Sequence, residues 1–214
     1  MKRIFVLVLV FFLAAGFARA GELVFPFDHE AELLKFSPAQ TAHCGTLSKW
    51  LLIDDPSASG GKALLVRPNP KTNYGSCFNV LLAKGVKAKD LRLKVMVKAV
   101  KGREDQGGGP LWRAKDENNY YVVRWNPLED NFRLYYVKDG RRRMLASASL
   151  KAKAHEWHEI VVEHQGSLIK CYFDGKLLLK KKDRTFSAAG TIGLWSKADA
   201  ETAFDSLSLE IINP

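Results

Sequence analysis

Two groups of acidic residues have a spacing that could support acid–base chemistry on a sugar. Hydrolysis of a glycosidic bond by the usual route needs two carboxyl groups about 5 to 9.5 Å apart. Glu159 and Glu163 would share one face of a strand, because neighbouring side chains point to opposite sides, and Glu129 directly precedes Asp130 in a predicted loop. Neither group lies among the aromatic residues that could hold a sugar, so the sequence does not favour two-carboxylate hydrolysis.

The elements that must position functional residues are predicted to be almost entirely β-strands. Apolar and polar residues alternate with the period of a strand in segments 91–98, 120–126, 132–137, 158–163, 168–173 and 206–211. Asp139-Gly140 and Asp174-Gly175 suit tight hairpin turns, and 28–36 is the one helix-like stretch. Strands that follow one another without helices between them indicate an all-β fold, a single antiparallel β-sandwich over residues 21–214.

The same segments carry motifs in an order found in one group of known sandwich folds. They are Asn119-Tyr-Tyr-Val-Val-Arg-Trp-Asn126, Asp139-Gly140, Trp157-His158, Tyr172-Phe-Asp-Gly175, Gly190-Thr-Ile-Gly-Leu-Trp-Ser-Lys197 and Phe204-Asp205. On these motifs, residues 85–212 resemble the concanavalin A-like jelly roll, and within it the bacterial 3-keto-disaccharide hydrolase-like family and laminin-G-like domains. The resemblance implies two curved antiparallel sheets, with ligands held on the concave face of one sheet or at its rim. It does not select an activity, because this fold includes lectins, glycosidases and adhesion modules.

On that fold, strand alternation sorts the side chains into a core set and a set on the open face. Tyr121, Val123 and Trp125 are predicted to face the core, as are Ile192 and Leu194. The opposite set, joined by Arg113 beside a glycine run, is predicted to bind ligand: Arg113, Tyr120, Arg124, Asn126, Arg133, Tyr135, Trp195 and Lys197. Aromatic rings pack against sugar C–H groups, while Arg and Asn donate hydrogen bonds to hydroxyls and carboxylates. This combination predicts a carbohydrate-binding site, and the excess of arginine favours an acidic glycan.

Other interpretations of the same features stay open. Arg and Lys could merely solvate an exposed sheet face, with Trp195 covering a sandwich edge. The basic runs within 84–101, 141–143 and 180–182 are typical of solvated edges and loops. By resemblance, the chain could instead be a hydrolase or lyase acting on keto-glycosides, or a laminin-G-like module that binds proteins or the cell envelope.

The histidines and two late aspartates are the remaining residues with chemical potential. Trp157-His158 opens a strand, where the resemblance implies that both side chains pack the sheet, whereas His155 and His164 are expected to be exposed. Asp199 and Asp205, together with loop carbonyls, could hold calcium, which takes six to eight oxygen ligands and which the jelly-roll resemblance allows at the rim. Calcium is the one cofactor that the sequence suggests.

The first 20 residues have the pattern of a secretory signal. Lys2 and Arg3 precede an apolar run, and Ala18 and Ala20 form a small-residue ending, so cleavage is expected after Ala20. The remaining chain would then be exported to the periplasm or the extracellular space, where disulfides form.

The cysteines and the net charge complete the expectations. Cys44 and Cys77 are the candidate disulfide pair and Cys171 is expected to be buried within a strand, with three free thiols as the alternative.

The formal net charge is +10, and loss of the three basic residues of the leader reduces it to +7. Positive charge can neutralise phosphates, but no nucleic-acid-binding motif is present, so nucleic acid is not expected as a partner. The predicted protein is an exported carbohydrate-binding jelly roll without recognisable catalytic residues.

Overall fold

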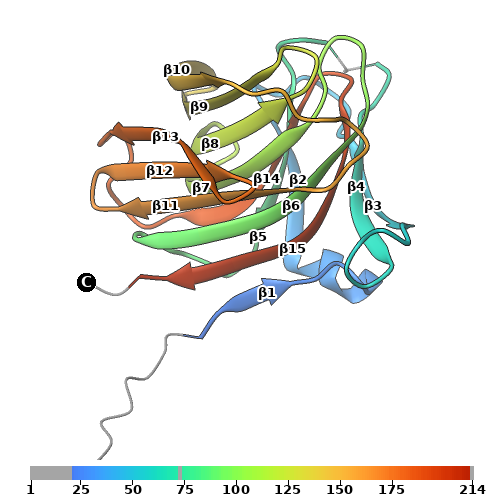
Figure 1. The fold of residues 1–214 in the computed structure, drawn as a ribbon, viewed down its shortest axis with the longest axis horizontal. Coiled ribbons are helices and arrows are strands. Elements are labelled where there is room, and N and C mark those ends of the chain that lie inside the picture. Colours follow the sequence, from blue (N-terminus) through green and yellow to red (C-terminus); the bar gives the residue numbers. More distant parts are fainter. Residues whose placement is uncertain (1–20, 72–73, 213–214) are drawn as a thin grey trace, which may run out of the picture.

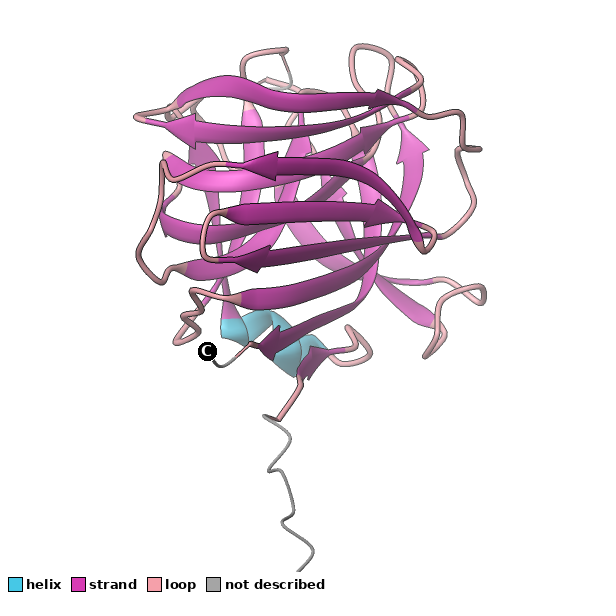
Figure 2. Cartoon of the chain, turned by 60° about the vertical axis from the view of Figure 1, so that its left-hand side comes forward, coloured by secondary structure: helices cyan, strands magenta, loops and turns pink. Residues whose placement is uncertain are grey.

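The computed structural model describes residues 21–71 and 74–212, so the predicted leader lies outside the described residues. Strands form where alternation predicts them, and the helix-like stretch is the short 3-10 helix η1 (Glu30–Lys35). Figure 2 shows strands almost throughout the drawn fold, with η1 beside the N-terminal strand. The prediction of an all-β fold is confirmed.

The described residues form two antiparallel sheets that pack against each other (Figure 1). The first sheet, in spatial order, contains β13 (Lys176–Lys182), β12 (Leu168–Phe173), β11 (His158–Gln165), β6 (Leu91–Lys101), β15 (Glu201–Ile211), β4 (Lys62–Arg67) and β3 (Lys49–Asp54), with β1 (Leu23–Phe25) also paired to β15. The second contains β10 (Arg141–Ser149), β9 (Asn131–Lys138), β8 (Asn119–Asn126), β7 (Gly108–Asp116), β14 (Thr191–Lys197), β5 (Phe78–Ala83) and β2 (Phe36–Thr41). Neighbours in each sheet are often distant in sequence, as in a jelly roll.

The main core fills the space between the sheets and follows the predicted alternation. Tyr121, Val123 and Trp125 of β8 point into it, as do Ile192 and Leu194 of β14, and all five side chains are fully buried. The intervening residues of these strands face the other side of the second sheet, where they form a separate buried cluster. Alternation therefore predicted correctly which side chains of these two strands face the core and which face outward.

A disulfide links β2 and β5, the two strands at one edge of the second sheet. Cys44, just after β2, is bonded to Cys77, just before β5, which confirms the predicted pair. The linked residues are 33 positions apart, so the bond should stabilise the fold by about 3 to 4 kcal/mol through restriction of the unfolded chain. Cys171 is buried and free, as predicted. Within the described part of the chain, no helix has the length and apolar character needed to cross a membrane.

Candidate functional site on the concave face

The outward face of the second sheet is strongly curved, and we call it the concave face. The buried side chains enclosed by this curve fill what we call its hollow. The guanidinium carbon of Arg142 on β10 lies 4.5 Å from the ring centroid of Tyr135 on β9 and 4.9 Å from that of Phe78 on β5. These two rings are therefore at most about 9 Å apart. In a flat sheet, the four strand spacings between β9 and β5 would amount to about 19 Å. The sheet thus curves around the side chain of Arg142.

Aromatic residues line this hollow, as the sequence predicts, but they are covered. The ring of Trp195 lies 5.3 Å from that of Phe78 and 5.8 Å from the guanidinium carbon of Arg142. Its Nε1 donates to the Tyr120 hydroxyl at 3.1 Å, and Tyr120 also shares a hydrogen bond of 2.7 Å with Thr41. Trp195 and Tyr120 are fully buried, and burial raises the pKa of Tyr120. The expected open stacking platform is therefore closed in this conformation.

A network of charged side chains lies beside these rings. Arg124 of β8 pairs in register with Arg133 of β9, and both donate to Glu129 Oε2, at 2.9 Å and 3.0 Å. Asn131 donates to the same oxygen at 2.8 Å. Burial alone would raise the pKa of Glu129, but the hydrogen bonds from Asn131 and Arg124 and the two positive charges lower it to about 2. Glu129 is therefore ionised near neutral pH and is unsuited to act as a proton donor.

In the sequence, the Glu129-Asp130 pair stands apart from the aromatic residues, and Glu129 is not among the residues predicted to bind ligand. The structure places the Glu129 carboxylate between Arg124 and Arg133, on the two strands that its loop connects. Alternation gives no information about loop residues of this kind.

Two arginines of the concave face retain N–H groups without acceptors. Arg124 is only 1% exposed, and its Nε and Nη1 are buried with no hydrogen-bond partner among the described residues. The same holds for Nη1 of Arg142. Burial lowers the pKa of Arg142, and the positive charge of Arg124 acts in the same direction. Buried donors nearly always have partners in folded proteins, so these orphaned donors point to a ligand.

Lys197 and Asn126 complete one end of the concave face. Lys197 Nζ donates to Asp105 Oδ2 at 2.7 Å, and Asn126 Nδ2 donates to Asp105 Oδ1 at 2.9 Å. Asp199 holds the loop that carries Asp105, because its carboxylate accepts the backbone N–H groups of residues 103–105. Burial opposes ionisation of Asp199, but these hydrogen bonds keep its pKa below the usual value. Asp199 thus positions part of the site.

The two aspartates considered for calcium belong to different networks. Asp205 accepts the backbone N–H of Ser59 at 2.8 Å and the hydroxyl of Ser206 at 3.1 Å, whereas Asp199 is occupied by the loop at 103–105. In residues 21–71 and 74–212, no group of three or more His, Cys, Asp or Glu side chains is arranged to hold a metal ion. A calcium site therefore stays a prediction from the sequence.

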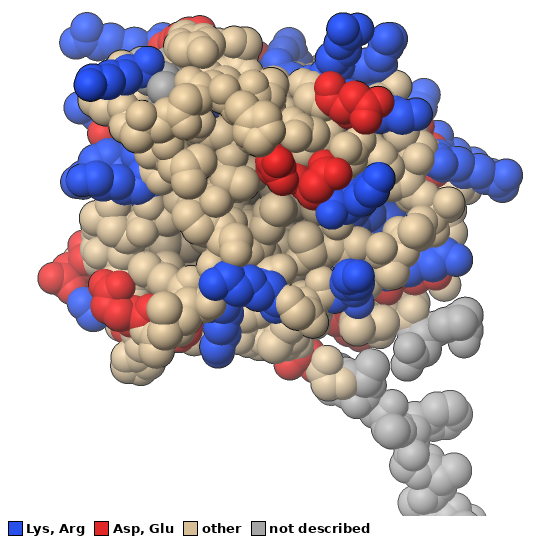
Figure 3. All heavy atoms as spheres, turned by 180° about the vertical axis from the view of Figure 1, so that it is seen from behind, with Lys and Arg blue, Asp and Glu red and all other residues tan. Residues whose placement is uncertain are grey.

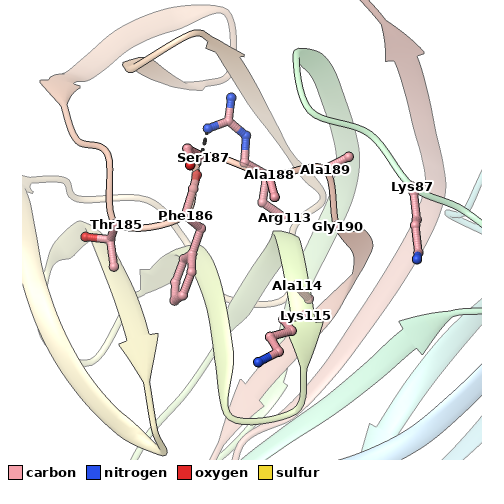
Figure 4. Close-up of a pocket in the computed structure, with 10 residues that line it drawn as sticks. All are labelled: Lys87, Arg113, Ala114, Lys115, Thr185, Phe186, Ser187, Ala188, Ala189 and Gly190. Carbon is pink, nitrogen blue, oxygen red and sulfur yellow. Dashed lines mark hydrogen bonds between the residues drawn. The ribbon is translucent and has the colours of Figure 1, made fainter.

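Arg113 is the one predicted ligand-binding residue that the structure separates from the others. It occupies a bulge of β7 with a φ of 46°, and the pairing with β8 shifts register between Trp112 and Asp116. Its guanidinium donates to the carbonyls of Lys89, Phe186 and Gly166 and to the Asp90 carboxylate, at 2.7 to 3.1 Å. Figure 4 shows this side chain directed toward the 186–189 segment, beside a hollow of about 350 Å³. Arg113 was assigned to the open face because it lies beside the glycine run, and the bulge directs its side chain elsewhere.

Two histidines show packing roles. His164 was expected to be exposed, but it is fully buried and accepts a hydrogen bond of 2.9 Å from Trp112 Nε1. Burial, followed by the nearby charge of Arg113, lowers the pKa of His164 to about 3, so the ring is neutral at physiological pH. His158 stacks on Phe173 with ring centroids 5.0 Å apart, which agrees with its predicted packing role.

The positive charge of the surface is dispersed on the face that Figure 3 shows, which is seen from behind the view of Figure 1. Lys and Arg side chains stand mostly along the outline of this face, and uncharged residues occupy most of its middle (Figure 3). This distribution gives no single basic patch on that face.

Two packed antiparallel sheets in this strand order, with a concave outer face on one of them, define a concanavalin A-like jelly roll. No protein-family model matches the chain, and no curated protein matches its sequence. The narrower family resemblances therefore stay expectations.

Solved structures share the architecture at low sequence identity. The chain is similar to the carbohydrate-binding module CBM66 from Bacillus subtilis, with a TM-score of 0.65 and 19% identity over 82% of this chain and 95% of that one. It is also similar to a Bacillus subtilis protein of unknown function with a galectin-like fold, with a TM-score of 0.64 and 8% identity over 88% of this chain and 94% of that one. A third similar structure is domain 4 of AbnA, an extracellular arabinanase from Geobacillus stearothermophilus, in complex with arabinotriose. Its TM-score is 0.58, with 13% identity over 87% of this chain and 89% of that one. At these identities the likeness shows the fold alone.

Proposed function

We propose that this chain is an exported carbohydrate-binding protein that holds a glycan in its concave face. The observation that carries this proposal is the presence, in one hollow, of aromatic rings and a buried guanidinium with unused N–H groups. Ring faces pack against sugar C–H groups, and guanidinium N–H groups bond to sugar oxygens. The likeness to a carbohydrate-binding module and to an arabinanase domain solved with arabinotriose supports a carbohydrate as the ligand.

Export is the second part of the proposal. The signal pattern over residues 1–20 supports it, and so does the disulfide between Cys44 and Cys77, because such bonds are rare in reducing compartments. Fractionation of cells that express the full chain should recover a protein that begins at Gly21 outside the cytoplasm. Recovery of the intact chain in the cytoplasm would contradict export.

Carbohydrate binding is tested by titrating a panel of neutral and acidic oligosaccharides into residues 21–214 by calorimetry. Arg133→Ala and Arg92→Ala form a matched pair of variants. Each arginine is partly exposed, with side-chain exposures of 33% and 43%, and each pairs with one glutamate. Arg133 lies on the concave face, whereas Arg92 lies on the outer face of the other sheet, paired with Glu163.

We expect at least one saccharide to bind the unmodified protein, with affinity weakened about fivefold or more by Arg133→Ala and changed less than about twofold by Arg92→Ala. Loss of binding in both variants would place the ligand elsewhere. Absence of binding across the panel would contradict the carbohydrate-binding function.

A further inference from the structure

We propose that the sugar bound in the concave face carries an anionic group, a carboxylate or a sulfate ester, which Arg124 and Arg142 hold between them. This inference rests on the proposed function, because it concerns the ligand of the same hollow. It assigns a chemical class to that ligand and a binding role to Arg142, which the sequence placed among solvated edge residues.

The charges within the concave face are unbalanced. Its cationic side chains are Arg124, Arg133, Arg142 and Lys197, and the acidic side chains bonded to them are Glu129 and Asp105. Glu129 is shared by two arginines and Asp105 is paired with Lys197. Among these six groups, positive charge exceeds negative charge by two. An anionic ligand would offset this excess, whereas a neutral sugar would leave it in place.

The hydrogen-bonding character of the hollow also favours an anion. A guanidinium group has donors only, and three of the nitrogens of Arg124 and Arg142 have no acceptor among the described residues. A carboxylate or sulfate has acceptor oxygens only, so all of its contacts with these nitrogens can be favourable. A sugar hydroxyl also brings a hydrogen, for which the two guanidinium groups offer no acceptor.

A glycine separates Trp195 from Arg124 on the concave face. Trp195 pairs in register with Gly109 of β7, and a Cβ at Gly109 would lie 3.3 Å from the Cα of Arg124. The residue between Trp195 and Arg124 therefore has no side chain. A Cβ there would also collide with the backbone oxygen of Val123 at 2.2 Å, so this position requires glycine. No side chain at position 109 therefore stands between the ring of Trp195 and the side chain of Arg124.

Arg142 is the side chain that must shift to admit this ligand. It projects from β10, the edge strand, and lies over the rings of Tyr135, Phe78 and Trp195. Cation–π contacts hold within about 6 Å of a ring centroid, so a guanidinium that shifts by a small distance over the same ring faces can keep part of them. In the shifted position it would contact the anionic group from the side opposite Arg124. Ligand binding would then bring a counter-ion between two guanidinium groups that repel each other in the free protein.

The test compares charged saccharides with neutral counterparts of the same size. Trigalacturonate and its fully methyl-esterified form are titrated into residues 21–214 by calorimetry, beside a sulfated heparin tetrasaccharide and its desulfated form. Arg142→Ala removes the proposed contact. Arg143→Ala is the control, because Arg143 is the exposed neighbour on the same strand.

We expect at least one anionic saccharide to bind about tenfold or more tightly than its neutral counterpart, and the preference to weaken as salt is raised. Arg142→Ala should reduce the ratio of the affinities for the anionic and neutral forms below about twofold, while Arg143→Ala should leave this ratio unchanged. The galacturonate and heparin pairs distinguish a carboxylate from a sulfate ester.

Equal affinity for charged and neutral forms would overturn the anionic subsite and leave carbohydrate binding intact. A preference that persists in Arg142→Ala would also overturn it, since the anion would then be held elsewhere. Absence of binding to these probes and to the whole neutral and acidic panel would overturn the proposed function itself.

Discussion

Arg113 and Arg124 are both buried, yet the fold uses the hydrogen-bond donors of the first and leaves most of those of the second without acceptors. The Arg113 guanidinium donates to three carbonyls and to Asp90, so the fold itself uses its donors. Arg124 donates only to Glu129, and its Nε and Nη1 are left without acceptors among the described residues. Burial therefore does not define a functional residue in this chain. The informative observation is burial combined with unused hydrogen-bonding capacity.

The largest expected effect follows from replacing each of these arginines by methionine, which keeps much of the side-chain volume. Arg113→Met leaves three carbonyls and the Asp90 carboxylate without their donor, so it should reduce the free energy of unfolding by about 3 to 5 kcal/mol. Arg124→Met should cost less than about 1 kcal/mol, because Glu129 keeps Arg133 and Asn131 and two buried donors without acceptors are removed. Urea unfolding monitored by tryptophan fluorescence measures both changes.

Equal destabilisation by the two substitutions would show that Arg124 is as structural as Arg113. A stabilising effect of Arg124→Met would show that the folded protein does not need this guanidinium. Residues at binding sites often lower the stability of the free protein.

A second, smaller effect is the pH dependence of stability, which differs between the surroundings of Arg113 and the concave face. His164 is near Arg113 in the sandwich interior, and its pKa is about 3 in the folded state against about 6.5 unfolded. Between these values the unfolded chain binds a proton that the folded chain does not, so stability falls as pH is lowered from 6.5. We expect a loss of about 2 kcal/mol between pH 6.5 and 4.5, measured by urea unfolding at each pH.

Substitution of His164 and of Glu129 should change different parts of the pH profile of the free energy of unfolding. His164→Phe should remove most of the slope between pH 6.5 and 4.5, whatever its effect on absolute stability. Glu129 in the concave face has a pKa of about 2 against 4.5, so its contribution is complete above 4.5 and is lost as pH falls toward 2. Glu129→Gln should therefore change the profile only below about pH 4.5. If the free energy of unfolding still fell as steeply with pH near 6 in His164→Phe, the assignment of this pH dependence to His164 would be contradicted.

Local alternation predicted much of this fold because most strands are regular. The two sides of β8 and β14 and the buried Cys171 agree with it. The disulfide pair was predicted separately, from the position of both cysteines in the turn-rich N-terminal third. The burial of His164 was also within reach, since it has the same parity as Ile160 and Val162 on β11. The prediction fails at Arg113, because a bulge with a φ of 46° changes the direction of the side chain.

The closure of the concave face was beyond local patterns. Curvature belongs to seven strands together, and it brings Tyr135 and Phe78 close enough for Arg142 to contact both. The sequence gives no sign of this, because Arg142 lies within a run of three arginines on an edge strand. Glu129 and Asp105 reach the face from loops, for which no periodicity exists.

The smallest expected effect on stability is that of Arg142→Ala. The substitution removes contacts with three rings, each of which stabilises by about 0.5 to 2 kcal/mol in folded proteins. It also removes the repulsion by Arg124 and a buried donor without a partner, which act in the opposite direction. The net change in the free energy of unfolding should lie within about 1 kcal/mol of zero, close to that of Arg143→Ala.

A loss above about 2 kcal/mol in Arg142→Ala would show that this side chain is a structural plug of the hollow, comparable to Arg113. A change near zero would show that Arg142, unlike Arg113, is not needed for stability. A long cationic side chain that fills an aromatic hollow at little net gain in stability can be displaced from it at little cost. That property is required of a residue that must make room for a sugar and then bind its anionic group.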